Sequence, residues 1–99
     1  MQLTKTDAMT YTLSLDERFD FSCVENFRRS YEDVDLSSVN TLILDFSLTK
    51  YIDSSALGML INAKGYFSES SVTIILSNCN AQIRKLFSIS RFDLKFIIS

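Results

Sequence analysis

Two serine hydroxyls and one carboxylate lie together where a hydrophobic strand is followed by a helix, at Asp53-Ser54-Ser55. A helix N-terminus has unpaired backbone amides and the positive end of the helix dipole, so a phosphate on a serine there is tolerated by the fold. The same residues also suit a simple helix cap, because Asp and Ser are common at that position. The local pattern on its own therefore favours an N-cap, at a position where an added phosphate would be tolerated.

The rest of the sequence offers little from which to build catalysis. It has no histidine, so the commonest general base and the commonest metal ligand are both missing. It also has no Gly-rich phosphate loop, no cluster with metal-ligand spacing and no base obviously placed beside a nucleophile. We expect the protein not to be an enzyme, and to use no cofactor and no metal.

Composition narrows the class of partner. The 99 residues carry a net charge of −2 and no long run of Lys or Arg, which argues against nucleic acid or an anionic membrane surface. No apolar run approaches the roughly 18 residues of a membrane span. The first residues, Met1 to Lys5, lack the charged and apolar regions of a signal peptide, so we expect none. We therefore expect one domain over residues 1–99, located in the cytoplasm, without membrane insertion.

The two cysteines, Cys23 and Cys79, lie far apart and outside any C-x-x-C pattern. A disulfide between them is compatible with the sequence. Two buried thiols in a reducing cytoplasm is the interpretation that we favour.

The elements that position Asp53 and Ser54 follow from hydrophobic spacing. Strands are expected at 2–6, 9–15, 39–46, 72–76 and 94–98, and helices at 22–31, 54–67 and 81–88. The order β-β-α-β-α-β-α-β predicts an α/β fold whose later strands are parallel, with right-handed crossovers. The continuous run Leu42-Ile43-Leu44 predicts a central strand covered on both faces.

Two helix starts carry recognisable caps. Ser22 and Glu25 have the spacing of a capping box, with Phe21 as a hydrophobic staple. Asn80 is a good N-cap for the third helix.

The helix expected at 54–67 has two faces. Its predicted apolar arc comprises Ala56, Leu57, Leu60, Ile61, Ala63 and Phe67. Gly58, Asn62 and Gly65 fall on the opposite side, flanked by Met59 and Tyr66 as possible apolar anchors. A strip of such low relief beside Ser54 suits the approach of a partner's backbone; it also suits an ordinary solvated helix face.

The central segment resembles the signature of STAS domains, the fold of bacterial anti-sigma factor antagonists. The matching residues are Ile43-Leu44-Asp45-Phe46 and Asp53-Ser54-Ser55-Ala56-Leu57-Gly58, with looser matches at Gln82–Ser90 and Phe19-Asp20. Ala56 stands where the family usually has Gly, and the Gly expected around Glu17 is absent. The resemblance implies a STAS fold with a mixed four- to five-stranded sheet and three to four helices.

The resemblance also implies a function and a site. Ser54 is the expected phosphoacceptor of an anti-sigma factor antagonist that takes part in partner switching. Its expected partners are an anti-sigma factor with serine kinase activity and a PP2C-type phosphatase that resets the cycle. The expected partner-binding residues are Asp53, Ser54, Ser55, Gly58, Met59, Asn62 and Tyr66.

Two alternatives stay open. In one, the chain is a STAS adaptor subunit of another system, such as a lipid ABC transporter, and the serine is an interface or capping group. In the other, the chain is a receiver domain with Asp53 as phosphoacceptor, although that fold requires an acidic pair after the first strand and more helices than this chain predicts.

Overall fold

A mixed five-stranded sheet forms the centre of the computed structural model, which describes all residues from 1 to 99. Its strands are β1 (Gln2–Asp7), β2 (Thr10–Ser14), β4 (Thr41–Asp45), β6 (Thr73–Ser77) and β7 (Ile97–Ile98). They lie in the order β1-β2-β4-β6-β7, with β1 antiparallel to β2 and every other neighbouring pair parallel. The expected α/β class, the mixed sheet and the parallel later strands are confirmed.

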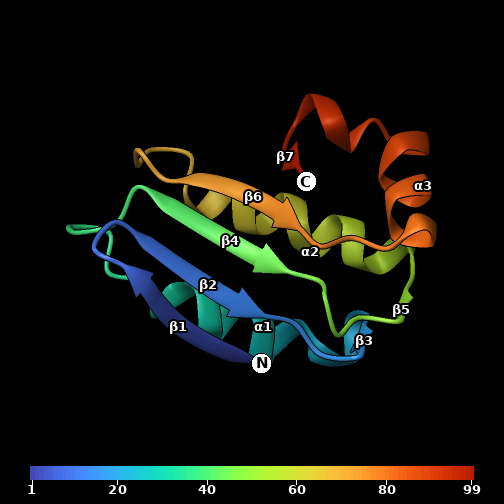
Figure 1. Cartoon of the computed structure of the whole chain (residues 1–99), viewed down its shortest axis with the longest axis horizontal. Coiled ribbons are helices and arrows are strands. Elements are labelled where there is room, and N and C mark those ends of the chain that lie inside the picture. Colours follow the sequence, from blue (N-terminus) through green and yellow to red (C-terminus); the bar gives the residue numbers. More distant parts are fainter.

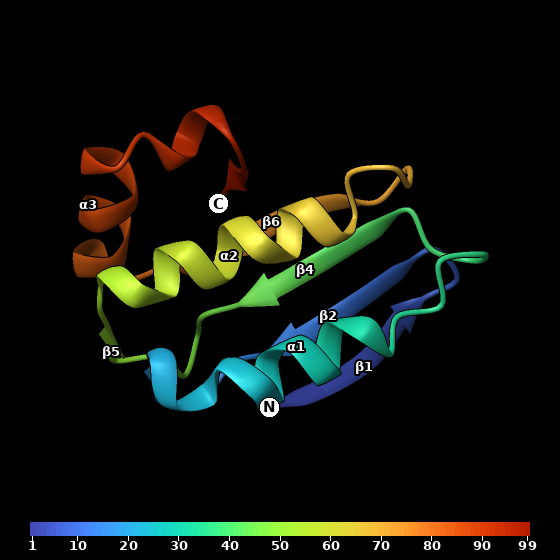
Figure 2. The same ribbon diagram turned by 180° about the vertical axis from the view of Figure 1, so that it is seen from behind.

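Two of the three helices cover one face of this sheet. Helices α1 (Val24–Glu32) and α2 (Ser54–Tyr66) lie behind the sheet in Figure 1 and in front of it in Figure 2. Helix α3 (Ala81–Ile89) lies beyond the carboxyl end of β6 (Figure 1). None of the helices combines the length and the apolar character that crossing a bilayer requires.

The two faces of the sheet differ because the helices gather on one of them. Leu42 and Leu44 of β4 are fully buried beneath the helices, whereas Ile43 between them is only half-buried. Ile43 lies in register between Thr12 and Ile75, which are also half-buried. The prediction that both faces of this strand are covered is therefore wrong; the unbroken apolar run reflects a half-buried isoleucine on the open face.

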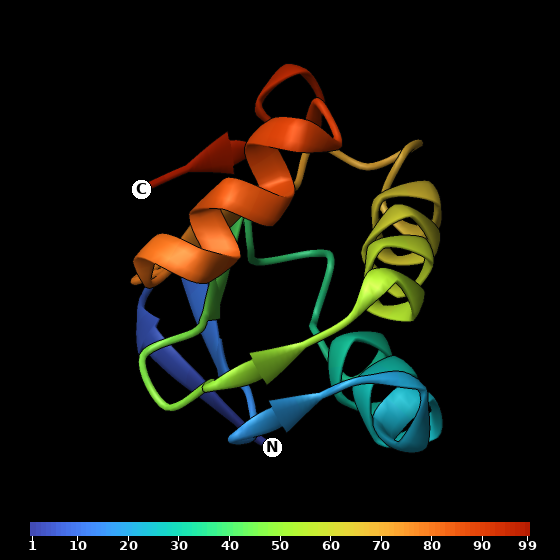
Figure 3. The ribbon, with the colours of Figure 1, turned by 90° about the vertical axis from the view of Figure 1, so that its right-hand side faces the viewer.

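A second, two-stranded sheet joins β3 (Arg18–Phe19) to β5 (Tyr51–Ile52). The strands are parallel, and Phe19 lies opposite Ile52. The sequence did not predict this pair, since strands of two residues show no periodicity. Figure 3 shows β3 and β5 side by side, each leading towards the start of a helix. The pair therefore brings the starts of the first and second helical segments to one place.

A continuous line of aromatic rings runs through the core from α1 to the C-terminal segment. In order, the rings are those of Tyr31, Phe27, Phe19, Phe46, Phe87, Phe92 and Phe96, with adjacent centroids 5.0 to 5.8 Å apart. Several pairs are edge-to-face, an arrangement worth about 0.5–1.5 kcal/mol beyond the buried area. This line fixes β3 and the end of the chain against the same core.

The first helical segment begins differently from its prediction. The 3₁₀ helix η1 (Phe21–Cys23) precedes α1, and the side chain of Asp20 caps it by accepting the Ser22 amide. The Ser22 hydroxyl donates to Asp20, so the expected capping box with Glu25 is wrong. Phe21 is exposed and therefore does not act as a staple.

Other details of the prediction are confirmed or shortened. Asn80 caps α3 by accepting the Ile83 amide at 2.9 Å, as expected. Cys23 and Cys79 are free, buried thiols, and burial raises the pKa of Cys79 to about 11. The last strand is only two residues long, since a second 3₁₀ helix, η2 (Phe92–Leu94), occupies the chain before it.

Helix α2 is rotated relative to the predicted apolar arc. Its buried residues are Ala56, Met59, Leu60 and Ala63. Ile61 is exposed instead, so the prediction that it faces the core is wrong. Packing decides which residues of α2 face the sheet. Met59 and Ile61 have similar hydrophobicity, so the sequence does not reveal which of them is buried.

Candidate functional site

Asp53 caps helix α2 and holds the second of the two serines. Its backbone is extended, and its Oδ1 atom accepts the Ser55 amide at 3.0 Å and the Ser55 hydroxyl at 2.5 Å. This satisfies one of the amides that a helix leaves unpaired at its N-terminus. Asp53 is thus an N-cap, and Ser55 is its structural partner.

Ser54 lies between these two residues and is the first residue of α2. It is exposed, and the hydroxyl that binds Asp53 is that of Ser55. The cap therefore presents the Ser54 hydroxyl to solvent at the positive end of a helix of 13 residues. A group with this placement is accessible to a modifying enzyme and lies where an added anion is stabilised.

The predicted strip on α2 is mostly where the sequence placed it. Gly58 and Asn62 are exposed, and they follow Ser54 at intervals of four residues along one helix face. A Cβ atom added at Gly58 or Gly65 would meet nothing within 4 Å, so the face is open and low. Tyr66 is partly exposed at the far end, with its ring 5.2 Å from that of Tyr31.

Met59 does not belong to this strip. Its side chain is only 4% exposed and packs in the core, so its prediction as an exposed anchor is wrong. Together with Tyr31 and Asn62, it lines a groove of about 210 Å³ between α1 and α2. Its unbranched side chain suits such an irregular gap between helices.

A second cap lies beside the first. Because β3 and β5 are parallel and pair Phe19 with Ile52, the residues that follow, Asp20 and Asp53, leave the pair at the same end. The neighbouring strands of a sheet are about 4.8 Å apart, which brings the two caps close together. Phe21, the residue displayed by the Asp20 cap, is 66% exposed.

The Asp20 cap is held by an arginine that rests on an aromatic ring. The guanidinium of Arg18 lies 4.2 Å from the centre of the Tyr51 ring and 3.2 Å from an Asp20 carboxylate oxygen. The hydrogen bond from the Ser22 hydroxyl, together with Arg18, outweighs partial burial and lowers the pKa of Asp20. The same carboxylate raises the pKa of Arg18.

Sequence reasoning did not place the exposed ring of Phe21 near Ser54. Three large side chains in this part of the chain are exposed: Phe21 in η1, Leu48 in the loop after β4, and Tyr51 in β5. The Asp-x-Ser spacing shared by Asp20 and Asp53 does not identify the exposed ring, because Asp45-Phe46-Ser47 has the same spacing and Phe46 is buried.

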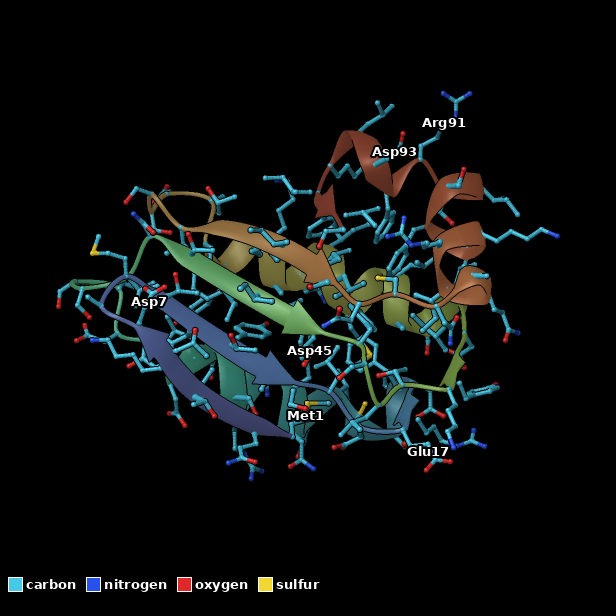
Figure 4. All side chains as sticks on the ribbon, in the orientation of Figure 1. Met1, Asp7, Glu17, Asp45, Arg91 and Asp93 are labelled. Atoms are coloured by element: carbon cyan, nitrogen blue, oxygen red, sulfur yellow. The ribbon has the colours of Figure 1, made fainter.

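Asp45 performs a different task. It lies at the end of β4 and accepts the Ser47 amide at 2.9 Å and the Asn78 side-chain amide at 3.0 Å (Figure 4). Burial opposes its ionisation, but these hydrogen bonds outweigh it and lower the pKa of Asp45. Asp45 therefore ties the loop after β4 to the loop after β6.

The family model for the STAS domain matches residues 1–99, the whole of the chain. The chain belongs to the STAS family. A STAS-domain containing protein of Pseudomonas aeruginosa (strain UCBPP-PA14) is 35% identical over 97 residues, covering 98% of this chain and 95% of that protein. The resemblance inferred from Asp53-Ser54-Ser55 and its flanking strand is thus confirmed.

Solved structures share the fold. A putative anti-sigma factor antagonist from Thermotoga maritima superposes with a TM-score of 0.81 and 20% identity, covering 98% of this chain and 83% of that one. The anti-sigma factor antagonist SpoIIAA, in unphosphorylated and phosphorylated forms, gives TM-scores of 0.73 at 22% and 23% identity. These two comparisons cover 99% of this chain and 86% and 89% of SpoIIAA. The predicted STAS architecture is confirmed.

Part of the chain is also similar to membrane transporters. Human testis anion transporter 1 is 35% identical over 57 residues, which are 58% of this chain and 6% of that protein. The structure of the murine anion transporter Slc26a9 superposes with a TM-score of 0.74 and 25% identity, covering 86% of this chain and 14% of that one. The fold is therefore shared with part of the Slc26a9 structure.

Proposed function

We propose that this STAS protein is an anti-sigma factor antagonist, and that phosphorylation of Ser54 controls its binding to an anti-sigma factor. The observation that carries the proposal is the bond between Asp53 and the Ser55 hydroxyl, which leaves Ser54 exposed as the first residue of α2. The similarity of the fold to the Thermotoga antagonist and to SpoIIAA supports the same role.

A phosphate on Ser54 leaves the fold intact. It adds about −1.5 to −2 charges at neutral pH, and these lie at the positive end of the α2 dipole, beside unpaired amides. No contact of the core has to break, because the Ser54 side chain is already in solvent. The modification therefore acts on what binds the surface, not on the domain that carries it.

The same phosphate opposes a partner docked on this surface. The proposed contact area comprises Asp53, Ser54, Ser55, Gly58, Asn62 and Tyr66, extended by the exposed ring of Phe21. A docked partner must desolvate the phosphate and face its charge. About 3 kcal/mol of such a penalty, felt in the complex alone, corresponds to about a hundredfold loss of affinity.

The proposed partners are those that the resemblance to anti-sigma factor antagonists implies. The anti-sigma factor is itself the serine kinase that modifies Ser54, and a PP2C-type phosphatase removes the phosphate. The antagonist acts by binding and carries out no chemistry of its own. The cycle takes place in the cytoplasm, where sigma factors meet RNA polymerase.

The test is to incubate the protein with its cognate kinase and Mg²⁺-ATP, and to locate the phosphorylated residue by mass spectrometry. We expect one phosphate on Ser54 in the wild type and in Ser55→Ala, and none in Ser54→Ala. Ser54→Asp should bind the anti-sigma factor about a hundredfold more weakly than Ser54→Ala does, with nearly the same thermal stability. Phosphate on Ser55, or equal binding of the two Ser54 variants, would falsify the proposal.

A second candidate is a STAS adaptor bound to a membrane transporter. It is favoured by the similarity to testis anion transporter 1 and to Slc26a9. In that role the α2 surface is a permanent interface, and Ser54 contacts the transporter without being modified. Affinity purification of the tagged chain from its own cells separates the two: the adaptor brings down a transporter subunit, and the antagonist a kinase-like anti-sigma factor.

A further inference from the structure

A larger cleft lies at the opposite end of α2 from Ser54. It has a volume of about 510 Å³ and is formed by the end of α2, the start of β6 and the segment from η2 to β7. Small-molecule sites in proteins range from about 300 to 1,000 Å³, so the cleft has the size of one. Ten residues of helix, at about 1.5 Å each, separate Ser54 from Lys64, the α2 residue that lines the cleft.

The cleft exists because β7 is too short to cover its neighbour. β7 pairs with Ile75 and Leu76, which leaves the first residues of β6 at an open edge. Before β7, the left-handed backbone of Arg91 turns the chain outwards into η2 (Figure 4). The Phe92 ring stacks on both Phe87 and Phe96, at 5.5 and 5.3 Å, and holds this wall of the cleft in place. The cleft is therefore preformed.

The floor of the cleft is apolar. Phe67, Ile74 and Phe96 line it and are otherwise buried in the core. Leu94 and Ile97, on the same wall, are 73% and 54% exposed, which is high for side chains of this size. An apolar ligand body seated here would cover both of them.

The rim of the cleft is positive. Two lysines, Lys64 and Lys95, line it against a single carboxylate, Asp93, although the chain as a whole is acidic. None of the three takes part in the ion pairs of the structure. The ammonium of Lys64 lies 5.6 Å from the centre of the Phe96 ring, directly over the floor. It also offsets the negative end of the α2 dipole, which on its own would repel an anion.

We propose that this cleft binds a small amphipathic organic carboxylate, with its apolar body on the aromatic floor and its carboxylate between Lys64 and Lys95. A wholly apolar ligand would leave both ammonium groups at the rim without a partner. A small inorganic anion would leave the apolar floor in water. Only a ligand with both parts satisfies the two kinds of lining. The proposal is independent of the role of Ser54.

The test is a titration of the ¹⁵N-labelled full chain with octanoate, below the concentration at which octanoate forms micelles, followed by amide chemical shifts. We expect saturable shifts at the backbone amides of residues 64–74 and 93–98, with none at the start of α2. Octanol, which lacks the charge, and acetate, which lacks the chain, should each bind at least about tenfold more weakly.

Matched variants test the rim. Lys64→Gln and Lys95→Gln should each weaken octanoate binding about tenfold, whereas Lys85→Gln, on the exposed face of α3 and outside the cleft, should leave it unchanged. Thermal unfolding of each variant identifies any loss of the fold. The proposal would be overturned if octanoate caused no saturable shifts, or if the shifts were centred outside the cleft. It would also be overturned if octanol bound as tightly as octanoate, or if neither lysine variant changed octanoate binding.

Discussion

The caps at Asp20 and Asp53 have the same local geometry and display different residues. In each, the Oδ1 atom accepts the amide of a serine two positions later at 3.0 Å and its hydroxyl at 2.5 Å. The residue between them is left exposed, and it is Phe21 in one cap and Ser54 in the other. The two caps lie side by side because β3 and β5 pair.

The difference shows how one local geometry displays two kinds of side chain. In both caps the aspartate holds the serine two positions later, and the side chain between them lies in solvent. A phenylalanine there supplies apolar contact area, and a serine supplies a hydroxyl that can be modified. The Asp20 cap has the support of Arg18, whereas Asp53 takes part in no ion pair. The second cap therefore has no ion pair to support it, and it begins the longer helix.

The largest effect is expected from the residue before the first cap. Phe19 is fully buried between the rings of Phe27 and Phe46, so Phe19→Ala should lower the free energy of unfolding by about 3–5 kcal/mol. Ile52, its counterpart before the second cap, is half-buried, and Ile52→Ala should cost less. Urea unfolding of both variants gives the comparison. An equal cost would mean that the two caps are supported alike.

Asp53→Ala is expected to have the next largest effect, on stability. Loss of an N-cap typically costs about 0.5–2 kcal/mol, and asparagine caps a helix about as well as aspartate does. Asp53→Asn should therefore unfold at nearly the same urea concentration as the wild type, and Asp53→Ala at a lower one. Loss of stability in both variants would show that the charge matters and not the capping bond alone.

The sequence predicted one of these caps and misassigned the other. The N-cap and the phosphorylation-site interpretations both placed the start of the second helix at Asp53 and Ser54. In the structure α2 begins at Ser54. At the first, Ser22 has two possible partners, Glu25 ahead and Asp20 behind, and spacing alone does not rank them. The paired strands β3 and β5 decide in favour of Asp20, because they fix its backbone in an extended conformation. That constraint comes from pairing between strands that are distant in the sequence, so local spacing does not reveal it.

The sequence did not predict all the buried residues of α2, for a similar reason. Periodicity showed that one face is apolar and that Gly58 and Asn62 lie elsewhere, as the structure confirms. Periodicity did not show that Met59 is buried and Ile61 exposed. Both residues lie at the edges of the apolar face, where the positions of α1 and the sheet decide which side chain is covered. The order of the three helices and of the five strands of the main sheet, and the parallel pairing of its later strands, depend on many residues at once and were predicted correctly.

A smaller effect, of opposite sign, is expected at Gly58. A Cβ there meets nothing within 4 Å, so Gly58→Ala should stabilise the fold by about 0.5–1 kcal/mol through helix propensity. Gly65→Ala, two turns further from Ser54, should do the same. If the partner docks beside Ser54, only Gly58→Ala should weaken its binding, which calorimetry against the anti-sigma factor measures. Equal effects of the two variants on binding would remove Gly58 from the proposed contact.

The smallest effect concerns the protonation of the first cap. The bond from the Ser22 hydroxyl is the main cause that lowers the pKa of Asp20, so Ser22→Ala should raise that pKa towards the ordinary value of about 3.9. Because the folded-state pKa is depressed, Asp20 stabilises the fold above the unfolded-state pKa and loses that contribution as pH falls through the folded-state value. NMR titration of the Asp20 carboxyl carbon measures both. If Ser22→Ala leaves the pKa unchanged while Arg18→Gln raises it, the ion pair holds the first cap, and the resemblance between the two caps is one of shape and not of energetics.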